Sequence, residues 1–184
     1  MKPSAYSLSR TDDLAQATAL LAEGGWGSKA VAGCQSLGAM LNLRLAQPEQ
    51  LLDLDAYESL RAVSDTGDAI RFGAMTTHAA IEDKRVPDPS QGLMPFVARG
   101  IAYRAVRNRG TLGGSLCHAD PAADWVNTMP LLGATLHVLG PDGERDIAAR
   151  DFMTSAYETQ LTDGELLIAV SVAKRAAGMQ WTGL

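Results

Sequence analysis

The 184-residue sequence contains only two cysteines, Cys34 and Cys117, and this scarcity excludes several classes of protein. Two thiols cannot supply the four thiolates of an iron–sulfur cluster or of a structural zinc site. They also do not form the disulfide framework typical of small secreted domains. Any iron–sulfur centre that works with this protein would therefore be carried by another chain.

Long apolar runs and an excess of positive charge are also missing. The net charge is −5, which gives no reason to expect nucleic acid or an anionic membrane as a partner. The mean hydropathy is −0.03, and no apolar run approaches the roughly 18 residues that a membrane span needs. The segment from Met1 to Asp13 has no signal-peptide pattern and no twin arginine, so we expect a cytoplasmic protein.

Residues 1–55 have the pattern of a small α/β unit. The expected elements are a helix over Leu14–Ala22, a strand over Lys29–Ala32, a helix over Leu37–Leu45 and a strand over Leu51–Leu54. Thr11 or Asp12 is the expected cap of the first helix, and Gly24-Gly25 its expected end. The order strand, glycine turn, helix, strand predicts a βαβ-like unit.

Residues 56–176 change to alternating strands and short helices, and indicate a second subdomain with a mixed or antiparallel sheet. We expect a hairpin of Leu60–Asp65 with Ala69–Gly73, helices over Thr77–Glu82, Pro95–Arg107 and Asp124–Leu132, and strands over Thr135–Gly140, Arg145–Ile147 and Leu166–Val172. The glycine-rich stretch Asn108–Ser115 is expected to break the helical pattern before it.

A glycine turn at Ala32–Ser36 joins the first predicted strand to a helix. Successive backbone N–H groups in such a turn can converge on an anion, at the positive end of the following helix. Gln35 and Ser36 add side-chain donors. The alternative is an ordinary strand-to-helix turn, because short glycine motifs recur often.

A second glycine-rich turn, Arg107–Leu116, precedes a small polar segment that ends in the carboxylate of Asp124. Paired glycines let the backbone approach a ligand closely. A carboxylate at this place can accept hydrogen bonds from sugar hydroxyls. The alternative is a flexible loop. Neither turn is a P-loop or the six-residue dinucleotide-binding motif.

These two segments together resemble the FAD-binding segments of one protein family. Residues 32–45 and 107–124 match, in order and separation, the flavoprotein (medium) subunits of molybdenum hydroxylases such as carbon monoxide dehydrogenase and xanthine dehydrogenase-like enzymes. The resemblance covers essentially the whole chain. It implies an α+β, PCMH-type FAD-binding fold, in which a small N-terminal α/β subdomain precedes a larger subdomain with an antiparallel sheet and helices.

The resemblance implies cofactor-binding roles for particular residues. The first turn would bind the FAD pyrophosphate through its backbone, Thr111, Gly114 and Ser115 would continue that lining, and Asp124 would hold ribityl or ribose hydroxyls. Lys29 and Leu167 would lie on the adenine side. The full set is Lys29, Ala32, Gly33, Cys34, Gln35, Ser36, Leu37, Thr111, Gly114, Ser115, Asp124 and Leu167. We expect no catalytic acid, base or nucleophile and no metal ligand, because the flavin performs the redox chemistry.

The same resemblance implies an oxidoreductase subunit within a heterotrimer. Electrons would pass from a molybdopterin-binding large subunit, through the [2Fe–2S] clusters of a small subunit, to FAD and then to an acceptor such as NAD, a quinone or O₂. A stand-alone flavin oxidase or reductase would need a substrate domain, for which the chain has no room. The other alternative is a flavin-free or weakly flavin-binding structural or assembly subunit.

The sequence departs from the family pattern in two places. Cys34 stands where relatives usually have a second glycine, and a cysteine there costs on the order of 1 kcal/mol if the position needs a positive φ. Family members also carry a further C-terminal domain. We expect residues 177–184 to be the start of that domain, which this chain lacks.

Other candidate groups carry weaker signals. The histidines His78, His118 and His137 have no carboxylate at ligand spacing, and His118 is within the second motif, where it could contact a cofactor or a neighbouring subunit. Four arginines between 91 and 119, with no acidic residue among them, predict a positive patch: Arg99, Arg104, Arg107 and Arg109. We favour charge compensation at helix ends over attraction for a pyrophosphate or an acidic partner.

Overall fold

A three-stranded parallel sheet organises the N-terminal part of the chain in the computed structural model, which describes residues 2–178 and 181. Its strands are β1 (Ser7–Ser9), β2 (Ser28–Val31) and β3 (Gln50–Asp53), in the order β1-β3-β2. Helix α1 (Leu14–Gly24) and helix α2 (Leu37–Asn42) connect them. The predicted βαβ-like unit is confirmed, because β2 and β3 are parallel neighbours joined by α2.

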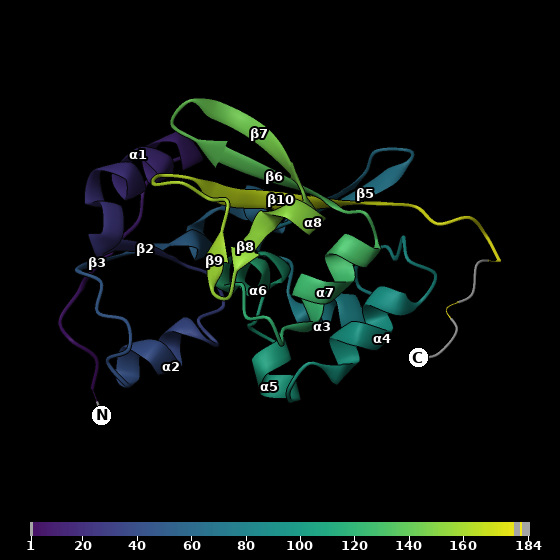
Figure 1. Ribbon diagram of the computed structural model, residues 1–184, viewed down its shortest axis with the longest axis horizontal. Helices are drawn as coiled ribbons and strands as arrows, with labels where there is room; N and C mark the ends of the chain where they lie inside the picture. Colours follow the sequence, from purple (N-terminus) through teal and green to yellow (C-terminus); the bar gives the residue numbers. More distant parts are fainter. Residues whose placement is uncertain (1, 179–180, 182–184) are drawn as a thin grey trace.

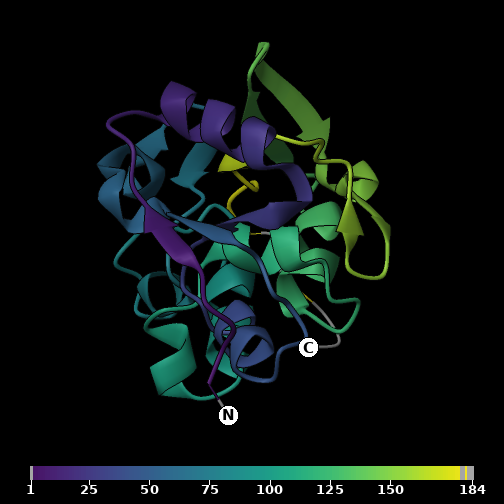
Figure 2. The same cartoon turned by 90° about the vertical axis from the view of Figure 1, so that its left-hand side faces the viewer.

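Adjacent residues of β3 bury opposite faces of this sheet, as strand geometry requires. Leu51 packs with Leu41 of α2, and Leu52 belongs to the cluster that contains Ala17 and Leu21 of α1. Figure 2 shows the consequence, with α1 above the small sheet and α2 below it. Both helices are therefore held by apolar contacts with the same short strand.

The first helix begins at Leu14 as expected, but its cap is a different residue. Asp13, not Thr11 or Asp12, is the N-cap, and its carboxylate accepts a 2.8 Å hydrogen bond from the Gln16 N–H. Thr11 instead forms a 2.5 Å hydrogen bond with the Tyr57 hydroxyl. Gly25, with a φ of +46°, ends the helix as predicted.

A five-stranded antiparallel sheet forms the larger part of the fold, with strand order β4-β5-β10-β6-β7. Its strands are β4 (Val63–Asp65), β5 (Ala69–Gly73), β6 (Thr135–Gly140), β7 (Gly143–Ala148) and β10 (Leu166–Ala173). Strand β10 lies in the centre, visible in yellow in Figure 1. Strand β10 is buried on both faces, and this explains why its sequence is a continuous apolar run rather than an alternation of apolar and polar residues.

Short helices gather below this sheet in Figure 1 and bury its lower face. They are α3 (His78–Glu82), α4 (Leu93–Gly100), α5 (Arg104–Arg107), α6 (Leu112–His118), α7 (Asp124–Leu131) and α8 (Ala149–Phe152). The largest core cluster includes Phe72 and Leu136 of the sheet with Trp125 of α7 and Phe152 of α8. The α+β architecture agrees with the sequence analysis.

The remaining elements are short and connect the larger ones. Three 3₁₀ turns, η1 (Gly25–Gly27), η2 (Leu54–Ala56) and η3 (Glu58–Arg61), and a small hairpin of β8 (Met153–Ser155) and β9 (Glu158–Thr159) complete the fold. Among the described residues, no helix is both long and apolar enough to cross a membrane.

Of the two sequence expectations for the segment 95–115, the single helix was wrong, and the break in the helical pattern after Arg107 is confirmed. The expected single helix over Pro95–Arg107 is two helices, because the chain turns at Ile101–Tyr103, where Ala102 has a φ of +41°. The glycine-rich stretch is a loop only as far as Thr111, which caps α6. Glycine at 113 is used for close packing, since a Cβ there would lie 2.6 Å from the Ala74 Cβ.

The division of the chain at residues 55 and 56 stays a prediction, and it falls inside η2. The segment 177–184, expected to begin a further domain, includes residues 179–180 and 182–184, which lie outside the described residues.

Candidate binding site

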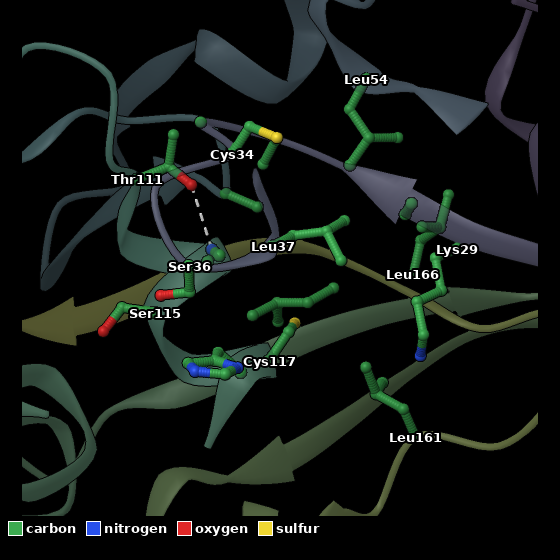
Figure 3. Close-up of a pocket in the computed structure, with 18 of the residues that line it drawn as sticks. Lys29, Cys34, Ser36, Leu37, Leu54, Thr111, Ser115, Cys117, Leu161 and Leu166 are labelled. Atoms are coloured by element: carbon green, nitrogen blue, oxygen red, sulfur yellow. Dashed lines mark hydrogen bonds between the residues drawn. The ribbon is translucent and has the colours of Figure 1, made fainter. Parts of the chain in front are cut away.

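A cavity of about 540 Å³ lies between the two sheets, and it collects residues from distant parts of the sequence. This volume is typical of a small-molecule or cofactor site. The first glycine turn, the loop before α6 with the start of α6, and the segment before β10 all contribute (Figure 3). All twelve predicted binding residues line the cavity, namely Lys29, Ala32, Gly33, Cys34, Gln35, Ser36, Leu37, Thr111, Gly114, Ser115, Asp124 and Leu167.

The two glycine turns touch each other at Gly33. A Cβ on Gly33 would lie 2.0 Å from the Arg109 carbonyl oxygen and 2.9 Å from the Gly110 Cα. Real Cβ atoms essentially never approach other atoms so closely, and the neighbour here is backbone that cannot rotate away. The absence of a side chain at this position therefore brings the two motifs together.

The first turn presents donors that the protein itself does not use. Among the described residues, no protein acceptor is bonded by the backbone N–H groups of Cys34, Gln35 and Ser36. The Gln35 side chain instead donates a 2.8 Å hydrogen bond to the Gly33 carbonyl, which braces the turn. Ser36 makes no side-chain cap for α2. Three amides and a hydroxyl are therefore free to bind an anion at the cavity wall.

The second turn has a different arrangement, because its amides are already bonded. The Leu112 and Gly113 N–H groups donate to the Thr76 and Ala74 carbonyls at 2.9 Å each. The Gly114 N–H donates to the Thr111 hydroxyl at 3.0 Å, the bond drawn in Figure 3. Thr111, Gly114 and Ser115 line the cavity as predicted, but this turn contributes hydroxyl groups rather than free amides.

The other end of the cavity is apolar. Figure 3 shows Leu54, Leu161 and Leu166 around the side chain of Lys29, away from Thr111 and Ser115. The apolar side chains suit a flat aromatic ring, and the Lys29 ammonium group places one positive charge beside it. The expectation that Lys29 lies on the adenine side stays a prediction.

The segment 161–165 is fixed by one ion pair, in which the Glu165 side chain is 9% exposed and the Arg145 side chain 41% exposed. Arg145 on β7 contacts both carboxylate oxygens of Glu165, at 2.6 and 2.8 Å, and also donates to the Gln160 carbonyl. Glu165 further accepts a 2.7 Å hydrogen bond from the Thr162 N–H. The Arg145 guanidinium lowers the pKa of Glu165 from 4.5 to about 2. The loop that forms this wall of the cavity is therefore held by a carboxylate that stays charged.

The Glu165 ion pair is expected to make stability fall in acid. The folded-state pKa is depressed, so the unfolded chain binds the proton first, and the stabilisation is lost as the pH falls from about 4.5 towards 2. Glu165→Gln should remove this part of the pH dependence, and Arg145→Met should do the same. Urea unfolding at stepped pH measures it. A wild-type pH dependence in both variants would contradict the assignment.

The backbone at Cys34 is strained, since its φ is +61°, in the left-handed region that favours glycine. Cys34→Gly is therefore expected to raise the free energy of unfolding by up to about 1 kcal/mol. Thermal unfolding should shift upward by about 2–4 °C. Cys34→Ala is the matched control, because it removes the thiol and keeps the strained Cβ. Equal stabilisation by alanine would show that strain is not the cause.

Two of the four arginines in the predicted patch, Arg104 and Arg107, are paired with carboxylates. Arg107 donates to Glu82 at 2.8 Å and to the carbonyls of Ile101 and Ala102, and Arg104 pairs with Glu82 and Asp83. These bonds tie α5 to α3. Arg99 lies in the last turn of α4, Arg104 and Arg107 lie in the last turn of α5, and Arg107 bonds carbonyls at the end of α4, as the favoured interpretation of charge compensation at helix ends predicts.

Sequence reasoning missed several residues that line the cavity. His78 was assigned only to a short helix, yet it lies in the cavity wall and is 5% exposed. Asp120, Asp163 and Glu165 add carboxylates that the motifs did not single out. No local pattern marks these residues, because each reaches the cavity through the packing of a different element.

Comparison with known proteins matches residues 4–174 to the family model described as the FAD binding domain in molybdopterin dehydrogenase. The chain is 33% identical over 178 residues to the 6-hydroxypseudooxynicotine dehydrogenase complex subunit alpha of Paenarthrobacter nicotinovorans, covering 97% of this chain and 60% of that protein. It is 32% identical over 181 residues to the carbon monoxide dehydrogenase medium chain of Hydrogenophaga pseudoflava, covering 98% and 63%.

Solved structures of similar proteins have the same fold as this chain. Carbon monoxide dehydrogenase from Hydrogenophaga pseudoflava superposes with a TM-score of 0.93 at 33% identity, over 97% of this chain and 62% of the other. Quinoline 2-oxidoreductase from Pseudomonas putida 86 gives a TM-score of 0.88 at 37% identity, over 96% and 61%. The chain therefore spans roughly three fifths of the length of these proteins.

Proposed function

The chain belongs to the family of FAD-binding domains of molybdopterin dehydrogenases, and on that premise we propose that it is the flavin-holding, electron-transferring part of such a complex. The observation that carries the proposal is the meeting of the two glycine turns in one cavity. The residues Cys34, Gln35 and Ser36, whose amides are unbonded among the described residues, line this cavity together with the hydroxyl-bearing Thr111 and Ser115.

The residues present fit FAD along the length of the cavity. Free amides and hydroxyls at one end suit the pyrophosphate, which is an anion with many acceptor oxygens. The apolar end around Leu54 and Leu166, with Lys29, suits the adenine. Asp124, the first residue of α7, has an exposed carboxylate that suits ribityl or ribose hydroxyls. The chain would position the cofactor, and the flavin supplies electron acceptance and donation when bound.

The other steps of the proposed electron transfer would take place in partner subunits. A molybdopterin-binding large subunit would oxidise the organic substrate, and a small subunit would carry the [2Fe–2S] clusters. Electrons would then leave through FAD to an acceptor such as NAD, a quinone or O₂, in a cytoplasmic heterotrimer. The two cysteines of the chain support this division, because they cannot hold a cluster.

The test is to purify the chain, add FAD, remove unbound cofactor by gel filtration and record the visible spectrum. We expect near one flavin per chain, and titration calorimetry gives the affinity. If the protein is colourless and calorimetry detects no binding heat on addition of FAD, the alternative of a structural or assembly subunit is supported instead. Co-purification with large and small subunits decides the proposal on partners.

A further inference from the structure

His78 and Trp125 form a buried pair at the wall of the cavity. The Trp125 indole N–H donates a 3.0 Å hydrogen bond to Nδ1 of His78, and the two side chains come from α7 and α3. Trp125 is completely buried, and His78 is 5% exposed. His78 nevertheless lines the cavity, together with Gly110 and Thr111 of the second turn.

This hydrogen bond decides which nitrogen of His78 carries the proton. An indole N–H can only donate, so Nδ1 must be the acceptor. A neutral imidazole that accepts at Nδ1 has its hydrogen on Nε2. Burial, with the nearby Arg107 guanidinium, lowers the pKa of His78 from 6.5 to about 4, so the ring is neutral near pH 7.

The Nε2–H group is left without a protein partner. Among the hydrogen bonds of the described residues, none uses Nε2 of His78, whereas its Nδ1 and its backbone N–H are both bonded. It is also not sealed off, because the fully enclosed unpaired side-chain atoms of the described residues are Thr76 Oγ1 and Arg175 Nε. A donor that the protein leaves unpaired at the wall of a cavity is available to bond a ligand there.

The position of the ring points to one part of the ligand. The Nε2–Cδ2 edge lies against Gly110, where a Cβ would be 2.8 Å from both atoms. Gly110 is also where the first turn meets the second, beside Gly33. The donor is therefore close to the junction of the two turns, the region that suits the pyrophosphate rather than the apolar end of the cavity.

We propose that His78 is a cofactor-binding residue whose Nε2–H donates a hydrogen bond to a phosphate oxygen of bound FAD, and that Trp125 is a positioning residue that fixes its tautomer. The proposal rests on the proposed function and deepens it. Trp125 directly follows Asp124, so one buried side chain fixes both the start of α7 and the direction of the histidine donor.

The test compares FAD affinity, by titration calorimetry on the full chain, among single variants. His78→Leu removes the donor and should weaken binding by about 10- to 100-fold, the effect of losing a hydrogen bond to a charged group. His78→Gln keeps an amide donor and should restore much of the affinity. His137→Leu is the matched control on β6, where its ring bonds Asp146 and Ser171 instead of lining the cavity, and it should bind FAD as the wild type does.

A spectroscopic readout separates ligand contact from a structural role. Nitrogen-15 NMR of the side chain should show the Nε2–H tautomer in the free protein, and Trp125→Phe should release that preference. Adding FAD or ADP, which both carry a diphosphate, should shift the Nε2–H resonance, and riboflavin should not. Thermal unfolding of each variant shows whether it is folded.

The outcomes are distinguishable. If the wild type binds no FAD, the proposed function and this inference are both wrong. If the wild type binds FAD and folded His78→Leu binds it equally well, only the role of His78 is wrong. A shift caused by riboflavin and not by ADP would overturn the assignment to phosphate.

Discussion

Gly33→Ala is expected to weaken FAD binding by about 100-fold or more, and to destabilise the fold by about 1–3 kcal/mol, the usual cost of overpacking. The added Cβ would lie 2.0 Å from the Arg109 carbonyl oxygen, a backbone atom that can move only if the whole second turn moves. The two turns would then separate. The free amides of Cys34 to Ser36 would no longer lie beside the hydroxyls of Thr111 and Ser115.

Calorimetry with FAD and thermal unfolding measure the two effects of Gly33→Ala separately. The matched control is Gly100→Ala at the end of α4, where no atom of the described residues lies within 4 Å of the added Cβ. The control should bind FAD as the wild type does and unfold at a similar temperature. If Gly33→Ala binds FAD with wild-type affinity, the close contact of the turns is not what forms the site.

Trp125→Ala is expected to destabilise the chain by about 3–5 kcal/mol, the range for removing a large aromatic side chain from a core. Trp125 is 0% exposed and belongs to the largest core cluster, with Phe72 and Leu136. Its loss leaves a cavity and removes the indole donor to His78. The midpoint of thermal unfolding should fall by about 6–20 °C.

Trp26→Ala is the matched control for Trp125→Ala, because Trp26 is 93% exposed in η1. A surface substitution of this kind changes the free energy of unfolding by less than about 0.5 kcal/mol. Urea unfolding of both variants gives the comparison. Similar losses in the two tryptophan variants would mean that burial in this structure does not describe the packing of Trp125.

The parts of the fold that could be predicted from the sequence are those with local causes. Strands β6 and β7 include the expected strands Thr135–Gly140 and Arg145–Ile147, and α3 lies within the expected helix Thr77–Glu82. The segments around Gly33 and Gly114 carry a recognisable residue order, so the sequence alone identified twelve of the cavity-lining residues. These signals depend on neighbouring residues alone.

The parts that could not be predicted depend on contacts between distant residues. Whether the amides of Gly113 and Gly114 are free depends on Ala74 and on the Thr111 hydroxyl, and no local pattern reports this. His78 reaches the cavity through its bond to Trp125, 47 residues away. Strand β1 pairs with β3, more than forty residues later, and its three residues carry too little pattern to be recognised.

Strand β10 has a consequence for how the whole chain unfolds. Leu166 and Ile168 of this strand belong to the cluster packed around α1, while Leu167, Val170 and Val172 belong to the larger cluster. One strand is thus shared by both hydrophobic cores, and neither core can open without exposing apolar surface of the other. We therefore expect a single cooperative transition, in which a cofactor bound between the sheets stabilises both by mass action.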